Sequence, residues 1–357
     1  MFITGTAMVC PVGLSAASAC AARRAGISGF HHLAYRDNAG EPIVGAAVPG
    51  LDWALSATAR LLKLVTRCLM DIVEGQPNID WERVPLMVCL AEPQRPWAGA
   101  DLAMSIRAHV QEMPGVRFHP QGVRLFASGH SAGFQALHAA RALIGSGQAE
   151  ACVVCGVDSF INAATLLWLD RDFRLKTPAN RDGVIPGEAA AAVLLEATAG
   201  GDTTVEVTGL GFGLEEAPIL SQEPLLGRGL ALAARAALAQ ARIGFHDIDL
   251  RLSDVTGELY GFKELPLVEG RLMRVVRKEA QLLWHWAEAI GDTGAAAGVA
   301  QLVLADEAFR KGYAPGKHAL CLTSSVAGER AVAVLRDSRY RQMHIQQGEG
   351  AEGLHGL

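Results

Sequence analysis

A strand–turn–helix segment in the first half of the chain carries the residue types of a hydrolase nucleophile. Residues 129–133 read GHSAG, which matches the G-x-S-x-G pattern that presents a reactive serine on a sharp turn. With Ser131 as nucleophile, Asp254 or Asp292 and then His318 would follow in the order serine, acid, histidine. The competing interpretation is that Ser131 only caps the helix that begins after it. The pattern is short, and the sequence contains no HGGG-type oxyanion loop, which favours the second interpretation.

Composition excludes several classes of protein. The chain has 357 residues with 32 basic and 37 acidic side chains, so it lacks the bulk positive charge that binds nucleic acid. Half of its residues are hydrophobic and 19% are charged, which is typical of a folded chain. No run of about 18 uncharged apolar residues occurs, so we expect no membrane span. No basic segment precedes the apolar N-terminus, so we also expect no signal peptide and a cytoplasmic protein.

Seven cysteines, an odd number in apolar surroundings, indicate buried reduced thiols rather than a disulfide framework. Cys152 and Cys155 have the spacing of a metal or redox pair. They lie in the apolar segment ACVVCGV, where a strand would place the two thiols on opposite faces. No second pair of Cys or His residues stands at ligand spacing, so we expect no cofactor there.

The spacing of apolar residues predicts alternating strands and helices, which is typical of an α/β protein. The predicted strands are 2–9, 85–91, 123–127, 151–157, 188–196, 204–207, 250–255, 319–323 and 330–335. The predicted helices are 15–25, 53–73, 103–110, 133–144, 230–241, 275–289 and one that follows the Gly/Ala turn at 291–298. Residues 165–182 are predicted to be irregular.

The second half of the chain repeats the order of elements of the first. Residues 133–147, GFQALHAARALIGSG, parallel residues 298–312, GVAQLVLADEAFRKG, because both begin and end on glycine and precede an apolar strand. Residues 200–202, Gly-Gly-Asp, mark the boundary. The predicted divisions are a first half at 1–200, a second half at 203–338 and a disordered tail at 339–357. Close packing of two such halves would explain the abundance of alanine and glycine.

Three segments resemble the ketoacyl synthases of the thiolase superfamily. Residues 2–13, FITGTAMVCPVG, are similar to the family's opening V-I-T-G-x-G-x-V-S-P-x-G, and residues 25–29, AGISG, to its A-G-x-S-G. Residues 181–196, RDGVIPGEAAAAVLLE, are similar to its R-D-G-x-x-x-G-E-G-A-x-x-x-x-L-E. The resemblance covers about residues 1–337. It implies a thiolase-like fold, a duplicated αβαβα arrangement of five layers, and a homodimer.

The resemblance also locates the family's Cys-His-His triad, and each position holds a different residue. The nucleophilic cysteine of A-C-x-x-G-x-x-A falls on His130, and the two histidines fall on Asp254 and Asp292. The family lysine falls on Ala287, and its G-F-G-G loop falls on residues 325–328, SVAG. Imidazole cannot hold an acyl chain as a stable thioester equivalent, and aspartates would repel the enolate that two histidines stabilise. The resemblance therefore implies a degenerate site without condensing activity.

Three interpretations of the residues at the triad positions remain open. His130 with Asp254 or Asp292 could be a general base with its orienting acid. The three side chains together have the composition of a metal site with one histidine and two carboxylates. The third interpretation is a buried ion pair that fills a polar pocket, and it is the one we favour.

Relatives of this kind that have lost the triad act by binding, so the resemblance implies a non-catalytic subunit. It could be a chain-length-factor-like partner of a ketosynthase, a carrier- or acyl-binding subunit, or a scaffold like the thiolase-like proteins beside type VI secretion adaptors that load effectors. Complete loss of the triad and the short chain favour the scaffold. The partners implied are a second copy, a secretion effector or adaptor, a ketosynthase or an acyl carrier protein. The competing class is an enzyme, either an acyltransferase or hydrolase using Ser131, or a metal-assisted enzyme using His130, Asp254 and Asp292.

Overall fold

The structure, a computed structural model, describes residues 1–98, 100–119, 122–200 and 205–339. One set of strands lies in the order β1 (Phe2–Val9), β7 (Glu188–Glu196), β6 (Ala151–Ser159), β4 (Leu86–Cys89) and β5 (Arg124–Phe126). A second set lies in the order β8 (Val205–Leu214), β12 (Glu329–Asp337), β11 (His318–Ser324), β9 (Leu250–Ser253) and β10 (Leu282–His285). Backbone pairing between the starts of β1 and β8 joins the two sets into one sheet.

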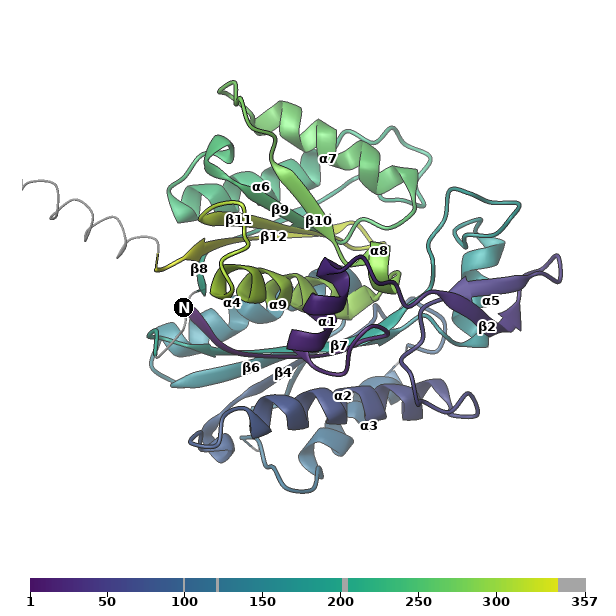
Figure 1. The fold of residues 1–357 in the computed structure, drawn as a ribbon, viewed down its shortest axis with the longest axis horizontal. Coiled ribbons are helices and arrows are strands. Elements are labelled where there is room, and N and C mark those ends of the chain that lie inside the picture. The colour runs from purple at the N-terminus through teal and green to yellow at the C-terminus, as the bar shows by residue number, and fades with distance from the viewer. Residues whose placement is uncertain (99, 120–121, 201–204, 340–357) are drawn as a thin grey trace, which may run out of the picture.

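Helices form three layers around the strands (Figure 1). One outer face is covered by α2 (Ala57–Glu74) and α3 (Ala100–Gln111), and the other by α6 (Arg228–Ala241) and α7 (Leu259–Leu272). Between the two sets of strands lie α1 (Ala16–Arg24), α4 (Ala132–Gly145) and α9 (Ala297–Arg310). The remaining elements are the hairpin β2 (His31–Arg36) and β3 (Pro42–Gly45), α5 (Ala163–Arg171), α8 (Ala287–Ile290), and the short 3₁₀ turns η1 (Trp81–Arg83), η2 (Gly129–Ser131), η3 (Phe245–Asp247) and η4 (Gly294–Ala296). This αβαβα layering confirms the predicted fold class.

The two sets of strands have the same topology. In each set, the first strand of the chain pairs antiparallel with the last, and the last pairs antiparallel with the strand on its other side. The two strands beyond run parallel to that strand. A 3₁₀ turn leads into α4 and another into α9, and these turns begin at Gly129 and Gly294, which have φ angles of 56° and 49°. The boundary predicted at residues 200–202 stays a prediction, because residues 201–204 lie outside the described ranges. Residues 340–357 of the predicted tail lie outside them as well.

The central helices account for the abundance of small residues. Every residue of α9 except Arg310 is buried, because both faces of this helix pack against strands or helices. At Gly156 in β6, a Cβ atom would meet the backbone of Ala295 and Ala296 in η4. Small residues at such contacts let the layers approach closely, as the sequence predicts.

The predicted helix at 275–289 is wrong. Residues 282–285 form the edge strand β10, which pairs in parallel with β9, and α8 follows after Trp286. The long helix of this region is α7, which the sequence does not predict because Pro266 interrupts its pattern. Residues 165–182 are not wholly irregular either, because α5 extends to Arg171.

The cysteines and the surface agree with the sequence analysis. All seven cysteines are free and buried. Cys152 packs in the central core and Cys155 in the core under α2, so the two thiols lie on opposite faces of β6 as predicted.

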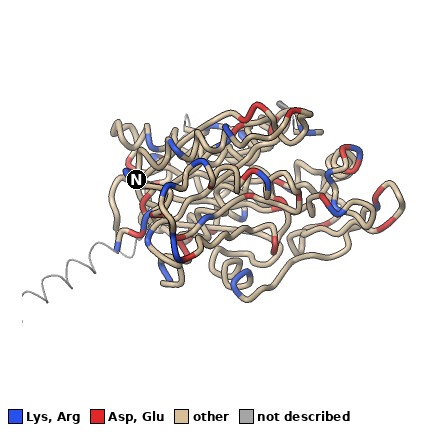
Figure 2. Tube along the Cα trace, turned by 90° about the horizontal axis from the view of Figure 1, so that it is seen from above, with Lys and Arg blue, Asp and Glu red and all other residues tan. Residues whose placement is uncertain are grey.

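Figure 2 shows basic and acidic positions interspersed along the described chain. No helix within the described ranges is long and apolar enough to cross a membrane.

Candidate functional site

His130 is positioned by the tight turn η2 between β5 and α4. Gly129 has a left-handed backbone conformation, which favours glycine. A Cβ atom there would overlap with the carboxylate of Glu92. The turn directs His130 into the interior, where its side chain is only 5% exposed.

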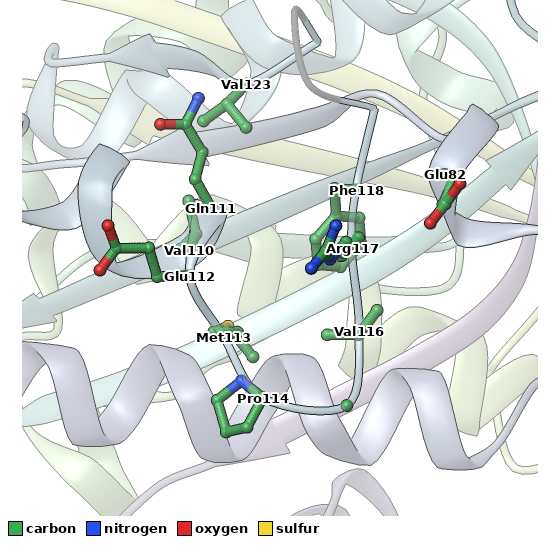
Figure 3. A pocket seen from close by; sticks show the side chains of 11 residues that line it. Glu82, Val110, Gln111, Glu112, Met113, Pro114, Val116, Arg117, Phe118 and Val123 are labelled. Carbon is green, nitrogen blue, oxygen red and sulfur yellow. The ribbon is translucent and has the colours of Figure 1, made fainter.

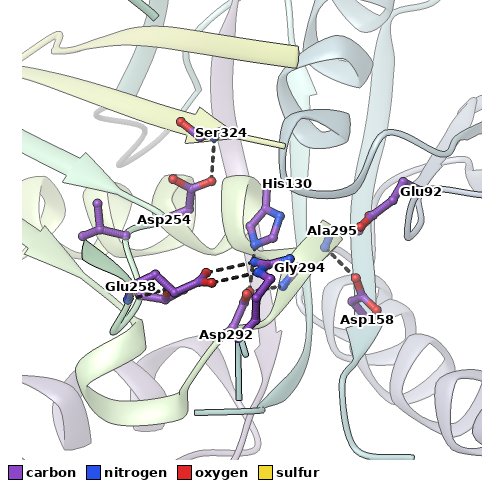
Figure 4. A network of polar contacts seen from close by, with 12 residues as sticks. Glu92, His130, Asp158, Asp254, Glu258, Asp292, Gly294, Ala295 and Ser324 are labelled. Carbon is purple, nitrogen blue, oxygen red and sulfur yellow. Dashed lines mark hydrogen bonds and ion pairs between the residues drawn. The ribbon is translucent and has the colours of Figure 1, made fainter. Parts of the chain in front are cut away.

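His130 is hydrogen-bonded to Asp292 (Figure 4). Nε2 of His130 lies 2.8 Å from Oδ1 of Asp292, which also accepts the N–H of Gly294 at 2.9 Å. Because a carboxylate can only accept, Nε2 of His130 carries the proton in this bond. Gly294 in turn has a positive φ, and a side chain there would overlap with the carboxylate of Asp158.

Asp254 lines the same pocket as His130 and Asp292. It follows β9, is partly buried, and accepts the N–H of Ser324 at 2.7 Å (Figure 4). The structure therefore brings together the three residues that the family resemblance placed in one site. Two of them form a directly bonded pair, and Asp254 lies beside that pair.

The charges of this cluster are strongly coupled. Burial lowers the pKa of His130, but neighbouring carboxylates outweigh this effect and raise that pKa to about 9. These carboxylates are Asp292, Asp254 and Glu92. Burial raises the pKa of Asp292, but the charge of His130 and the hydrogen bonds it receives outweigh burial and lower it. Burial raises the pKa of Asp254 to about 6.

Replacing Asp292 by asparagine is expected to lower the pKa of His130 from about 9 to about 6.5 or below, because burial then dominates. NMR titration of the imidazole measures this change. The pKa of His130 is raised on folding, so the pair stabilises the fold fully below about pH 6.5. That stabilisation is lost as the pH rises through about 9. Asp101→Asn, at an exposed position on α3, is the matched control. An unchanged titration in Asp292→Asn would contradict this assignment.

Two buried ion pairs also line the pocket, and Figure 4 shows Glu258, which belongs to one of them. The guanidinium of Arg174 donates two hydrogen bonds to Glu258, at 2.8 and 2.9 Å. Arg330 donates to Glu264 at 2.8 Å and to the hydroxyl of Tyr260 at 2.7 Å. Arg330 lies in β12, Tyr260 and Glu264 lie in α7, and Glu258 directly precedes α7, so the second half of the chain contributes most of this wall.

A third ion-paired group lies behind His130. Arg95 donates to Asp158 at 2.9 Å and to Glu92 at 3.0 Å, and Asp158 also accepts the N–H of Ala295 at 2.8 Å. Neither these residues nor the ion pairs Arg174–Glu258 and Arg330–Glu264 were predicted from the sequence. One signal was available, because Asp158 is a charged residue in the otherwise apolar segment 151–158 and would need a partner there.

The pocket between these side chains is small. Its volume is about 50 Å³, which holds a few water molecules and lies far below the roughly 300–1,000 Å³ of ligand pockets. A cavity of about 970 Å³ lies at the end of α3, between Gln111 and Val123 (Figure 3). It is lined by none of the predicted site residues. Because the pocket beside His130 has a volume of only about 50 Å³, it has no room for an acyl chain.

Ser131 does not belong to a catalytic triad in the structure. Its hydroxyl donates to the carbonyl of Ser128 at 3.1 Å and accepts from the amide of Gln135 at 3.3 Å. His318 begins β11, and Asp254 follows the parallel strand β9, so they lie at opposite ends of these strands. The Ser-acid-His arrangement is not formed. The capping interpretation is wrong as well, because the Ser131 side chain accepts no backbone N–H of α4.

The metal interpretation gains no support from the geometry. Within the described ranges, no group of three or more His, Cys, Asp or Glu side chains is arranged to hold a metal ion. His130 uses its Nε2 proton to bond Asp292 directly. The bond between His130 and Asp292 fits a buried ion pair, and it equally fits a general base with its orienting acid.

Comparison with known proteins supports the resemblance. Residues 123–199 match the family model described as Beta-ketoacyl synthase, N-terminal domain. This span contains the turn that carries His130 and the motif at 181–196. No curated protein matches the sequence.

Solved ketosynthase structures share the fold. One shows a type II polyketide synthase acyl carrier protein in complex with its ketosynthase, and matches with a TM-score of 0.77 and 16% identity over 94% of this chain and 98% of that chain. A ketosynthase in complex with its chain length factor from Xenorhabdus doucetiae has a TM-score of 0.72 and 16% identity, with the same coverage of 94% and 98%. A β-ketoacyl synthase from Burkholderia phymatum has a TM-score of 0.72 and 16% identity, covering 95% of this chain and 99% of its own. The chain therefore has the fold of these ketosynthases, and its residues 123–199 are similar to the N-terminal domain of the β-ketoacyl synthases.

Proposed function

We propose that the protein is a ketosynthase-like subunit that does not condense acyl chains and acts by binding another protein. The observation that carries this proposal is the hydrogen bond between His130 and Asp292 in a pocket of about 50 Å³. The family resemblance predicts His130 at the nucleophile position and Asp292 at a histidine position. Condensation needs a nucleophile that can hold the acyl chain and donors that stabilise an enolate. His130, bonded to Asp292, is not a nucleophile that holds an acyl chain, and the pocket has no room for that chain.

A ketosynthase is the partner class that the comparisons support best. The matched structures include a ketosynthase in complex with its chain length factor and another in complex with an acyl carrier protein. The present chain is similar to them over 94% of its length, so a surface used for such assembly has a counterpart in its fold. A homodimer is the alternative assembly.

The edge strand β5 offers a surface for such an assembly. Within the described residues it has β4 as its one neighbour, so its other edge is open to pairing with another chain. The N–H of Leu90, just after β4, bonds the carbonyl of Phe126. Because successive residues of a strand point their backbone groups to opposite sides, the N–H of Leu125 points to the open edge.

Co-expressed with a ketosynthase of the same genome, the tagged chain is expected to co-purify as a complex of the two chains. Leu125→Pro removes the N–H at the open edge and is expected to weaken this complex by at least about tenfold. Leu125→Val keeps that N–H and is the matched control. Size-exclusion chromatography with light scattering measures the complex. Failure to form any complex, or a complex that Leu125→Pro leaves intact, would contradict the proposal.

The type VI secretion role and the enzymatic use of Ser131 stay predictions. None of the reported matches bears on the type VI secretion role, which a pull-down with a secretion adaptor or effector would test. A cytoplasmic location likewise stays a prediction. The enzymatic alternative, in which Ser131 acts as the nucleophile of an acyltransferase or hydrolase, lacks a nearby base in the contacts of its hydroxyl.

A further inference from the structure

Three buried polar atoms in the pocket beside His130 have no hydrogen-bond partner among the described residues. They are Nδ1 of His130, Nη1 of Arg174 and Oγ of Ser325. Their residues are 4%, 5% and 2% exposed, and all three line the same pocket. Buried polar groups are nearly always paired, so three such atoms around one pocket point to a binding site for a small polar ligand.

The unpaired atoms are hydrogen-bond donors. Nε2 of His130 carries a proton because it bonds the carboxylate of Asp292. The pKa of His130 is raised to about 9, so Nδ1 carries a proton at neutral pH as well. The guanidinium of Arg174 can only donate, and the hydroxyl of Ser325 can donate. The occupant must therefore accept hydrogen bonds from two cations and a hydroxyl.

The carboxylates of the pocket decide the charge of that occupant. Asp292, Glu258 and Glu264 are each bonded to a cationic partner. Asp254 lacks one, and accepts instead the backbone N–H of Ser324. An ionised Asp254 would repel an anion, whereas its neutral form would add one more donor.

We propose that this pocket binds one small monovalent anion, of the size of formate or a halide, together with one proton that Asp254 takes up from solvent. The volume of about 50 Å³ accommodates such an ion but no acyl chain. The proposal does not depend on the proposed binding function, because it concerns the pocket alone.

Proton uptake predicts how binding depends on pH. The pKa of Asp254 is raised to about 6 by burial, while the charges of His130 and Arg330 lower it and that of Asp292 raises it. The groups that act on His130 are Asp292, Asp254 and Glu92, and they keep it protonated up to about pH 9. Between about pH 5 and about pH 8, the anion affinity should therefore fall by about 10- to 100-fold as Asp254 loses its proton.

Calorimetric titration with sodium formate at both pH values tests the proposal. Asp254→Asn should bind formate at about pH 8 at least about tenfold more tightly than the wild type and lose the pH dependence. Ser325→Ala should weaken binding by about five- to tenfold at the lower pH, because one hydrogen bond is lost. Asp101→Asn, exposed on α3, is the control for the loss of one carboxylate and should behave like the wild type.

A bromide soak of crystals at about pH 5 locates the ion independently of the variants. The expected result is one anomalous peak within hydrogen-bond distance of Nδ1 of His130, Nη1 of Arg174 and Oγ of Ser325. Absence of that peak, or formate binding that is equal in the wild type and Asp254→Asn at both pH values, would overturn the proposal.

Discussion

Replacing Arg95 by alanine is expected to lower the free energy of unfolding by about 3–5 kcal/mol. The guanidinium donates to Asp158 at 2.9 Å and to Glu92 at 3.0 Å, and lies 4.1 Å from the centre of the Phe160 ring. All of these groups are buried. The variant would leave two carboxylates in the interior without a cation, and one of them, Asp158, also holds the backbone of Ala295. The loss of stability therefore extends to η4, whose Gly294 donates a hydrogen bond to Asp292.

Urea denaturation of Arg95→Ala measures this effect. The matched control is Arg83→Ala, whose partner Glu150 lies 3.6 Å away with both side chains exposed. An exposed pair of this kind contributes at most about 1 kcal/mol. If Arg95→Ala costs no more than Arg83→Ala, the buried ion pairs do not stabilise this site.

The strands were the most predictable part of the fold. β1 and β7 have the ranges that the sequence predicts, because β7 is an apolar segment between two glutamates and β1 ends just before the turn that contains Pro11 and Gly13. α9 also agrees with the prediction, because the glycine-bounded segment 298–312 repeats the segment 133–147 that forms α4. In such segments, local pattern and tertiary environment agree.

The region between residues 255 and 290 was not predictable in the same way. Pro266 interrupts the pattern of α7, and packing against α6 and the second set of strands compensates for the lost backbone hydrogen bond. The apolar segment 282–285 is too short to distinguish a strand from a helix. This segment is a strand because it pairs with β9. That pairing depends on how the sheet is assembled and not on the local sequence.

The candidate site, like the fold, has one part that the sequence predicts and another that it does not. The family motifs point to His130, Asp254 and Asp292 as neighbours, and the structure places them around one pocket. The ion pairs around them could not be predicted. Arg174 and Glu258 are separated by 84 positions in the sequence. Arg330 and Glu264 are separated by 66 positions. No local pattern relates such partners, because they meet only through the arrangement of the layers.

The chain is expected to gain no acyl group when it is incubated with the acyl thioester of a carrier protein. Nε2 of His130 is engaged by Asp292, and an acyl-imidazole would hydrolyse rather than accumulate. The hydroxyl of Ser131 donates to the backbone of Ser128, with no general base among its contacts. The pocket of about 50 Å³ also has no space for the chain.

Intact-protein mass spectrometry after incubation with acyl and malonyl thioesters of carrier protein tests the loss of condensing activity most directly. A condensing ketosynthase treated in the same way is the positive control. The predicted result is an unchanged mass for this chain and malonyl thioester consumption at the background rate. A stoichiometric acyl adduct that disappears in Ser131→Ala or in His130→Ala would contradict the account and identify an active enzyme.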